Sequence, residues 1–204
     1  MQTPSFEAIG DTAYAIDNFA VNGVGDGAAE IQVMNAAGSW IGDYFWFNEF
    51  DDGTTVYPAG WFDATGTTPA DIALNPGDGV FFFTGQEGAS IQSAGEVAST
   101  AITNSVVAGY SMIGNASPVA INADDMQVLG VGDGAAEIQV MDATGSWIGD
   151  YFWFNEFDDG TTVYPAGWFD ATGTTPADLT LQPGESVFFY TGTSGAKVVI
   201  PSAM

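Results

Sequence analysis

The chain has 204 residues, with 26 acidic residues against one basic residue, Lys197, and it has no histidine or cysteine. A formal net charge of −25 leaves almost no cationic surface to hold phosphates and repels anionic lipids, so nucleic-acid binding is nearly excluded. The absence of cysteine removes disulfides and thiolate metal sites, and no apolar run approaches the roughly 20 residues of a membrane span, so no membrane insertion is expected.

The predicted elements are short strands from one end of the chain to the other. Runs rich in Val, Ile, Thr and aromatic residues alternate with turn formers, and no stretch sustains a helical apolar period. In the first part of the chain we expect strands at residues 29–34, 39–47, 54–57, 70–74, 79–84 and 89–92. Regularly spaced strands without helices indicate an all-β fold of sandwich or barrel type.

A long internal repeat doubles this pattern. Residues 23–85 match residues 130–192 at a constant offset of 107, and only eight of these 63 positions differ. Most of the differences preserve size or polarity, so the two copies must share a fold. We place the boundary near Val97, which predicts two tandem homologous β-sandwich or barrel domains, residues 1–97 and 98–204.

Upstream of the repeat the two copies diverge. Residues 6–11 resemble residues 110–115, but the strand-length segment 99–107 of the second copy faces only residues 1–4 in the first. The first copy therefore lacks one N-terminal strand, and a missing strand leaves a sheet edge that another chain can fill by strand addition. The segment that we assign to such an assembly contact is Ser5, Phe6, Glu7, Ala8 and Ile9.

An aromatic run, Tyr-Phe-Trp-Phe, stands at residues 44–47 and again at 151–154. Because neighbours in a strand face opposite sides, each face of the strand receives two rings. One pair can fill the core, and the other needs cover from the chain itself, from a protein partner or from a sugar. We assign Trp46 and Trp153 to an assembly interface, with internal cover and carbohydrate binding as alternatives.

Carboxylates gather in the loops of both copies. Calcium takes six to eight oxygen ligands, which such loops can supply, but the spacing is not that of an EF-hand and Asp-Gly pairs are also ordinary turn chemistry. The candidate calcium ligands are Asp26, Glu49, Asp51 and Asp52, with Asp133, Glu156, Asp158 and Asp159 in the second copy. The expected cofactor is therefore either none or Ca²⁺.

The residues that usually carry catalysis are scarce. A serine nucleophile would lack its histidine, and nothing in the spacing places two carboxylates at the separation that glycoside hydrolysis requires. Lys197 is the only side-chain amine. We therefore predict that the protein is not an enzyme.

Two short motifs resemble a known family. Residues 109–115, Gly-Tyr-Ser-Met-Ile-Gly-Asn, and residues 181–190, Leu-Gln-Pro-Gly-Glu-Ser-Val-Phe-Phe-Tyr, are similar to the opening and closing segments of β-rich repeat modules in secreted bacterial surface proteins of the Verrucomicrobia and Bacteroidetes type. In the first copy the closing segment is clear at residues 74–83, whereas the opening is degraded. The resemblance implies an extracellular, non-catalytic module, and it brings no active residues with it.

These observations favour a secreted structural protein of the cell surface that assembles with itself into a filament, a pilus-like fibre or a surface layer. The start of the chain lacks a basic region and an apolar region, so we expect either a cytosolic protein or, in preference, one whose signal peptide has been removed. The alternatives are an adhesin or carbohydrate-binding module, with glycans as partners, and a calcium-stabilised spacer domain.

Overall fold

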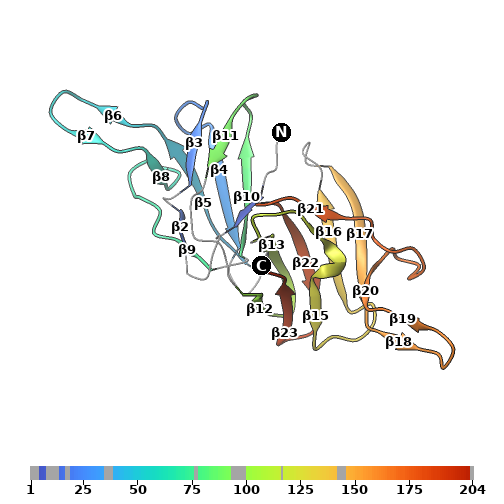
Figure 1. The fold of residues 1–204 in the computed structure, drawn as a ribbon. Coiled ribbons are helices and arrows are strands. Elements are labelled where there is room, and N and C mark those ends of the chain that lie inside the picture. The colour runs from blue at the N-terminus through green and yellow to red at the C-terminus, as the bar shows by residue number, and fades with distance from the viewer. Residues whose placement is uncertain are drawn as a thin grey trace.

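The computed structural model describes residues 5–7, 14–16, 19–34, 39–75, 78–92, 100–115, 117–141 and 146–202. These residues form short strands in several open sheets, together with a short 3-10 helix (Figure 1). The prediction of an all-β fold is confirmed. Within the described ranges no sheet closes into a barrel.

Strands follow one another closely in the first half of the chain. They are β1 (Ser5–Glu7), β2 (Tyr14–Ala15), β3 (Ala20–Asn22), β4 (Ala29–Met34), β5 (Trp40–Phe47), β6 (Phe50–Asp51), β7 (Val56–Tyr57), β8 (Gly60–Phe62), β9 (Ala73–Leu74), β10 (Gly79–Thr84) and β11 (Ser90–Gln92).

The second half repeats this order with one strand added at its start. Its elements are β12 (Ile102–Val106), β13 (Gly109–Gly114), β14 (Ile121–Asn122), the 3-10 helix (Ala123–Asp125), β15 (Gln127–Leu129), β16 (Ala136–Met141), β17 (Trp147–Phe154), β18 (Phe157–Asp158), β19 (Val163–Tyr164), β20 (Gly167–Phe169), β21 (Thr180–Leu181), β22 (Ser186–Thr191) and β23 (Ala196–Ile200).

Strand β4 shows how the sequence determines which face is buried. Ile31 and Val33 are buried, whereas Glu30 and Gln32, which alternate with them, are only half-buried. This alternation is the period of two that a strand with one face on the core requires. Strand β16 has the same sequence and the same burial pattern.

Each half contains one five-stranded antiparallel sheet, in the order β1-β10-β4-β5-β8 in the first and β13-β22-β16-β17-β20 in the second. The register is equivalent in the two sheets, since Phe81 lies opposite Gln32 and Phe188 lies opposite Gln139. The remaining strands form smaller sheets, β11-β3 with β2-β9 and β6-β7 in the first half, and β12-β23-β15 with β14-β21 and β18-β19 in the second.

The offset of 107 extends upstream of the repeat, further than the sequence indicated. Phe6 lies opposite Val80, and Ile113 lies opposite the equivalent Val187. Phe6 therefore takes the place of Ile113 and not that of Tyr110, with which sequence similarity paired it. Strand register is set by pairing with the neighbouring strand, so the weak similarity of the upstream sequences did not predict which residues are equivalent.

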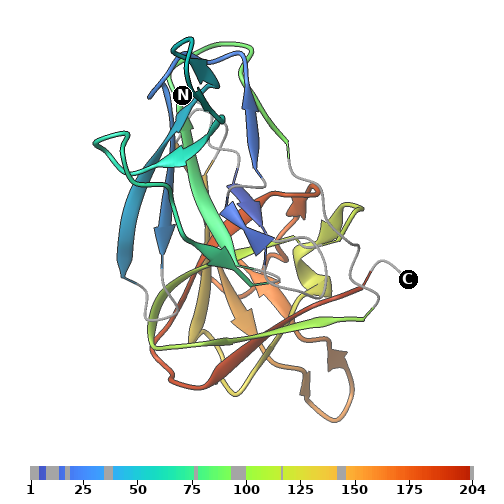
Figure 2. The same ribbon diagram turned by 90° about the vertical axis from the view of Figure 1, so that its left-hand side faces the viewer.

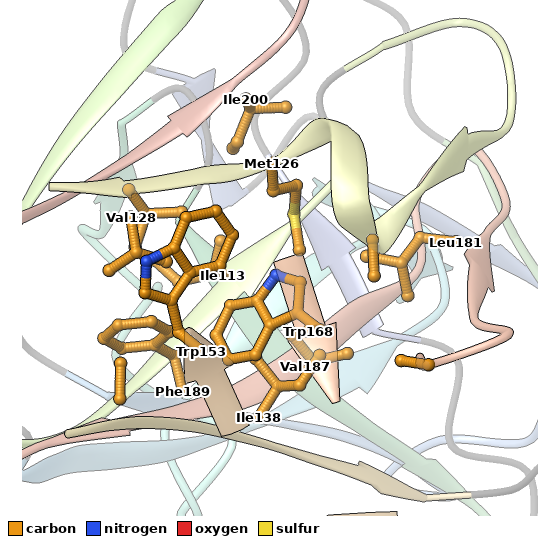
Figure 3. Close-up of a cluster of buried hydrophobic side chains, with 14 of the residues drawn as sticks. Ile113, Met126, Val128, Ile138, Trp153, Trp168, Leu181, Val187, Phe189 and Ile200 are labelled. Atoms are coloured by element: carbon orange, nitrogen blue, oxygen red, sulfur yellow. The ribbon is translucent and has the colours of Figure 1, made fainter. Parts of the chain in front are cut away.

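The described residues contain two hydrophobic clusters, one in each half. In the second cluster, Val128 and Val198 of the three-stranded sheet share a core with Val187 and Phe189 of the five-stranded sheet. Figure 3 shows Val128, Val187 and Phe189 gathered around the indole rings of this half. The division into two domains at residue 97 stays a prediction.

The two halves contact each other through equivalent residues. The rings of Phe81 and Phe188 are 6.5 Å apart between centroids, and these residues are related by the offset of 107. A Cβ on Gly79 would lie 3.0 Å from the Cβ of Ser186, its own equivalent. Self-matching contacts of this kind indicate an approximate two-fold axis between the halves. They also explain one of the differences between the copies, because a side chain at residue 79 would crowd Ser186.

Candidate functional site

The smaller sheets of the two halves differ at one edge. In the second half β23 has a neighbour on each side, so that Val198 lies opposite both Asn104 of β12 and Val128 of β15. Figure 2 shows β12, in green, beside β23, in red. In the first half Ile91 of β11 lies opposite Val21 of β3, and among the described residues no strand lies on the other side.

The edge of β11 is therefore a candidate site for strand addition. An edge strand presents a row of backbone N–H and C=O groups that can pair with another chain. Ser90 and Gln92 are exposed there, whereas Ile91 packs partly against the core of the first half. An added strand would thus extend a sheet that already covers this core.

The N-terminal segment assigned to assembly is described only in part. Ser5–Glu7 form β1, which pairs with β10 at the outer edge of the five-stranded sheet. Ala8 and Ile9 lie outside the described residues. The assignment of this segment to an assembly contact stays a prediction.

Trp46 and Trp153 are core residues, which corrects their assignment to an assembly interface. Their side chains are only 5% and 3% exposed. The ring of Trp46 packs edge-to-face on that of Trp61, with 5.5 Å between centroids, and its Nε1 donates to Asn48 Oδ1 at 3.2 Å. The strand alternation was correctly expected, but it places these rings on the inner face of the sheet.

The aspartate carboxylates predicted to bind calcium already accept hydrogen bonds from the loops around them. Asp26 Oδ1 accepts hydrogen bonds from the backbone N–H and from Nδ2 of Asn48, both at 2.9 Å. Asp52 Oδ1 accepts the backbone N–H groups of Thr54 and Thr55, both at 2.8 Å. The hydroxyl of Thr54 also donates to Asp52 and, as the largest cause, lowers the pKa of this carboxyl.

Four of the six remaining candidates also accept hydrogen bonds in turns. Asp133 and Asp159 repeat these bonds in the second half, Asp51 and Asp158 each accept the N–H of a turn glycine, and Glu49 and Glu156 are exposed. No group of three or more His, Cys, Asp or Glu side chains in the described part of the chain is placed to share a cation. Calcium binding stays a prediction.

Sequence reasoning missed an aromatic pair on the β6–β7 hairpin. Phe50 lies opposite Tyr57, and their rings are stacked with 6.2 Å between centroids and an angle of 25° between planes. Both side chains are exposed, by 60% and 50% respectively. Phe157 and Tyr164 form the same pair on the β18–β19 hairpin. The sequence feature that could have predicted this pair is the aromatic residue on either side of the Asp-Asp-Gly-Thr-Thr turn.

A cleft of about 370 Å³ lies beside this pair in the first half. Its lining includes the rings of Phe47, Phe50, Tyr57 and Phe62 and the carboxylates of Asp26 and Asp52. Gly66 packs on Phe47 so closely that a Cβ there would lie 2.9 Å from the ring. The cleft thus combines apolar rings with hydrogen-bond acceptors.

Asp63 and Asp170 hold the equivalent loops that follow β8 and β20. Asp63 Oδ1 accepts the hydroxyl of Thr65 at 2.7 Å and the backbone N–H of Thr67 at 3.3 Å. The Thr65 hydroxyl is the largest cause that lowers the pKa of Asp63 from 3.8 to about 2, and the Thr172 hydroxyl does the same for Asp170.

We expect these two loops to give the protein an acid-sensitive stability. Because the folded-state pKa is depressed, the stabilisation is complete above pH 3.8 and is lost as the pH falls toward about 2. The paired substitution of Asp63→Asn with Asp170→Asn should flatten the dependence of the melting temperature on pH across this window. An Asp71→Asn control should leave the dependence unchanged. An equally steep acid limb in the paired variant would contradict the assignment.

Comparison with known proteins gives no relative: no family model, no curated protein and no solved structure matches this chain. Within the described residues, no helix is long and apolar enough to cross a membrane.

Proposed function

We propose that the protein is a secreted, non-catalytic structural protein that assembles with itself by strand addition, into a filament or a surface layer. Its two copies, residues 1–97 and 98–204, are tandem β-sandwich domains in this proposal. One observation carries it: β23 is paired on both sides, whereas its equivalent β11 is paired with β3 alone among the described residues. A strand from a neighbouring copy takes the place beside β11 that β12 holds beside β23.

The second half indicates what the added strand must provide. Val106 of β12 is buried and Ile102 is half-buried against the core, while Thr103 and Ser105 between them are exposed. A donor strand therefore needs apolar or small residues at alternate positions, together with backbone groups free to pair. The donor that the sequence predicts is the segment of residues 5–9 of a neighbouring copy, whose residues 5–7 must leave their pairing with β10 in order to donate.

The charge supports assembly through backbone pairing more than through ion pairs. With 26 acidic residues and one basic residue, two copies repel each other at long range, and they gain little from opposite charges at a contact. Hydrogen bonds between strands do not require such charges. Added salt screens the repulsion, so assembly should increase with ionic strength.

A peptide with the sequence of residues 100–108 tests the proposal directly, because it contains the strand that fills the equivalent place in the second half. Added to the full chain, it should bind beside β11, slow hydrogen exchange at residues 90–92 and reduce the fraction of assembled protein. Analytical ultracentrifugation and electron microscopy measure that fraction.

The matched control is the same peptide with Asn104→Pro, which removes a backbone donor and should not bind. Deletion of residues 1–9 tests the donor separately, since it should abolish assembly while leaving peptide binding intact. A chain that stays monomeric at all salt concentrations, or equal protection by both peptides, would overturn the proposal.

A further inference from the structure

The two aromatic hairpins present flat apolar surfaces to solvent. Phe50 and Tyr57 are at least half exposed and nearly parallel, with 25° between their planes. Large exposed rings that lie together usually mark a contact surface. The flat C–H face of a pyranose ring matches the outer face of such a stacked pair, and this contact removes apolar surface from water without requiring an opposite charge.

The polar groups of the cleft set the charge of its ligand. Asp26 and Asp52 line it, and ionised carboxylates only accept hydrogen bonds. The bonds described for both carboxylates end on Oδ1, which leaves Oδ2 as an acceptor for a ligand. A ligand must therefore bring donors, as sugar hydroxyls do, and an anionic ligand is repelled by these groups and by the net charge of −25.

A cationic ligand would also satisfy the carboxylates, but the rings argue against it. A cage for a quaternary ammonium places several exposed rings around the cation, each within about 6 Å of it. Here the two most exposed rings of the cleft stack on each other, so they do not surround a central point and each ring presents only its outer face. We propose that this cleft, and the equivalent ring pair of Phe157 and Tyr164, bind neutral carbohydrate chains.

The arrangement of the two sites adds a property that one site would lack. The ring pair has the same separation and angle in both halves. Figure 1 shows the β6–β7 and β18–β19 hairpins projecting at opposite ends of the molecule, as the approximate two-fold axis requires. Two sites that face away from each other bind two separate chains, so each molecule cross-links carbohydrate polymers instead of binding one polymer twice.

Calorimetry on the full chain with cellohexaose, xylohexaose, mannohexaose and maltohexaose tests the proposal. At least one of these neutral oligosaccharides should bind with two sites per chain. The paired substitution of Tyr57→Ala with Tyr164→Ala should weaken binding at least tenfold, the loss that about 1.4 kcal/mol of ring contact represents. Tyr164→Ala alone should leave one site per chain, and, at concentrations where ultracentrifugation finds the chain monomeric, it should abolish the clumping of beads coated with the bound sugar while the beads still retain protein.

Tyr110→Ala is the matched control, because it removes an exposed tyrosine that packs at a tilt against Tyr190 outside the hairpins, and this variant should bind like the unaltered chain. Circular dichroism checks that each variant folds. Absence of binding to all four oligosaccharides, equal affinity in the paired variant, or binding of tetramethylammonium at these rings in their place would overturn the proposal. None of these results bears on strand addition at β11, which the peptide experiment tests.

Discussion

Replacing Asn115 with alanine should lower the free energy of unfolding by about 3–5 kcal/mol, because it removes three hydrogen bonds to backbone groups at a buried position. The side chain is fully buried. Its Nδ2 donates to the carbonyls of Val119 and Leu181, both at 2.9 Å, and its Oδ1 accepts the N–H of Ser117 at 2.8 Å. Two of these bonds hold a local turn, and the bond to Leu181 spans 66 residues.

Urea denaturation of the full chain measures this loss, with Asn122→Ala as the control. Asn122 is a half-buried cap whose Oδ1 accepts the N–H of Asp124 at 2.9 Å, so its removal should cost only about 1 kcal/mol. A loss for Asn115→Ala no larger than that of the control would contradict the role assigned to the buried amide.

Asn115 also shows what the sequence could and could not predict. The motif Ile-Gly-Asn stood out in the sequence as a resemblance, but no pattern of composition indicates that its amide is buried and makes three bonds. The all-β class and most of the strands of the repeat followed from turn spacing and from β-branched and aromatic runs. These predictions succeeded because buried and half-buried residues alternate along a strand, as Ile31 and Val33 show in β4.

The candidate sites were harder to predict because they depend on contacts between distant segments. Strand alternation gave Trp46 two possible faces, and only the position of the core decides between them. The pairing of Phe50 with Tyr57 depends on a two-residue strand, β6, that no periodicity analysis resolves. The sequence repeat predicted that the first half lacks a strand, but the register of β1 differs by three residues from the best sequence match.

The equivalent tryptophans Trp61 and Trp168 offer a comparison within one chain. Both are fully buried and pack on equivalent neighbours. The Nε1 of Trp61 donates to the carbonyl of Phe19 at 2.8 Å, whereas the Nε1 of Trp168 is buried without a hydrogen-bond partner. Substitution by phenylalanine removes the same volume at both positions but removes a hydrogen bond at only one. We expect Trp61→Phe to destabilise the chain by about 1–3 kcal/mol more than Trp168→Phe.

Denaturant unfolding with hydrogen exchange measures this difference, because exchange assigns the loss to the half that carries the substitution. The unaltered tryptophan of the other half serves as the internal reference in each variant. Trp61→Phe takes a donor away from a buried carbonyl. Trp168→Phe instead removes a buried N–H that has no partner, and this gain offsets part of the stability lost with the smaller ring. Equal losses in the two variants would mean that ring packing alone determines the stability of both cores.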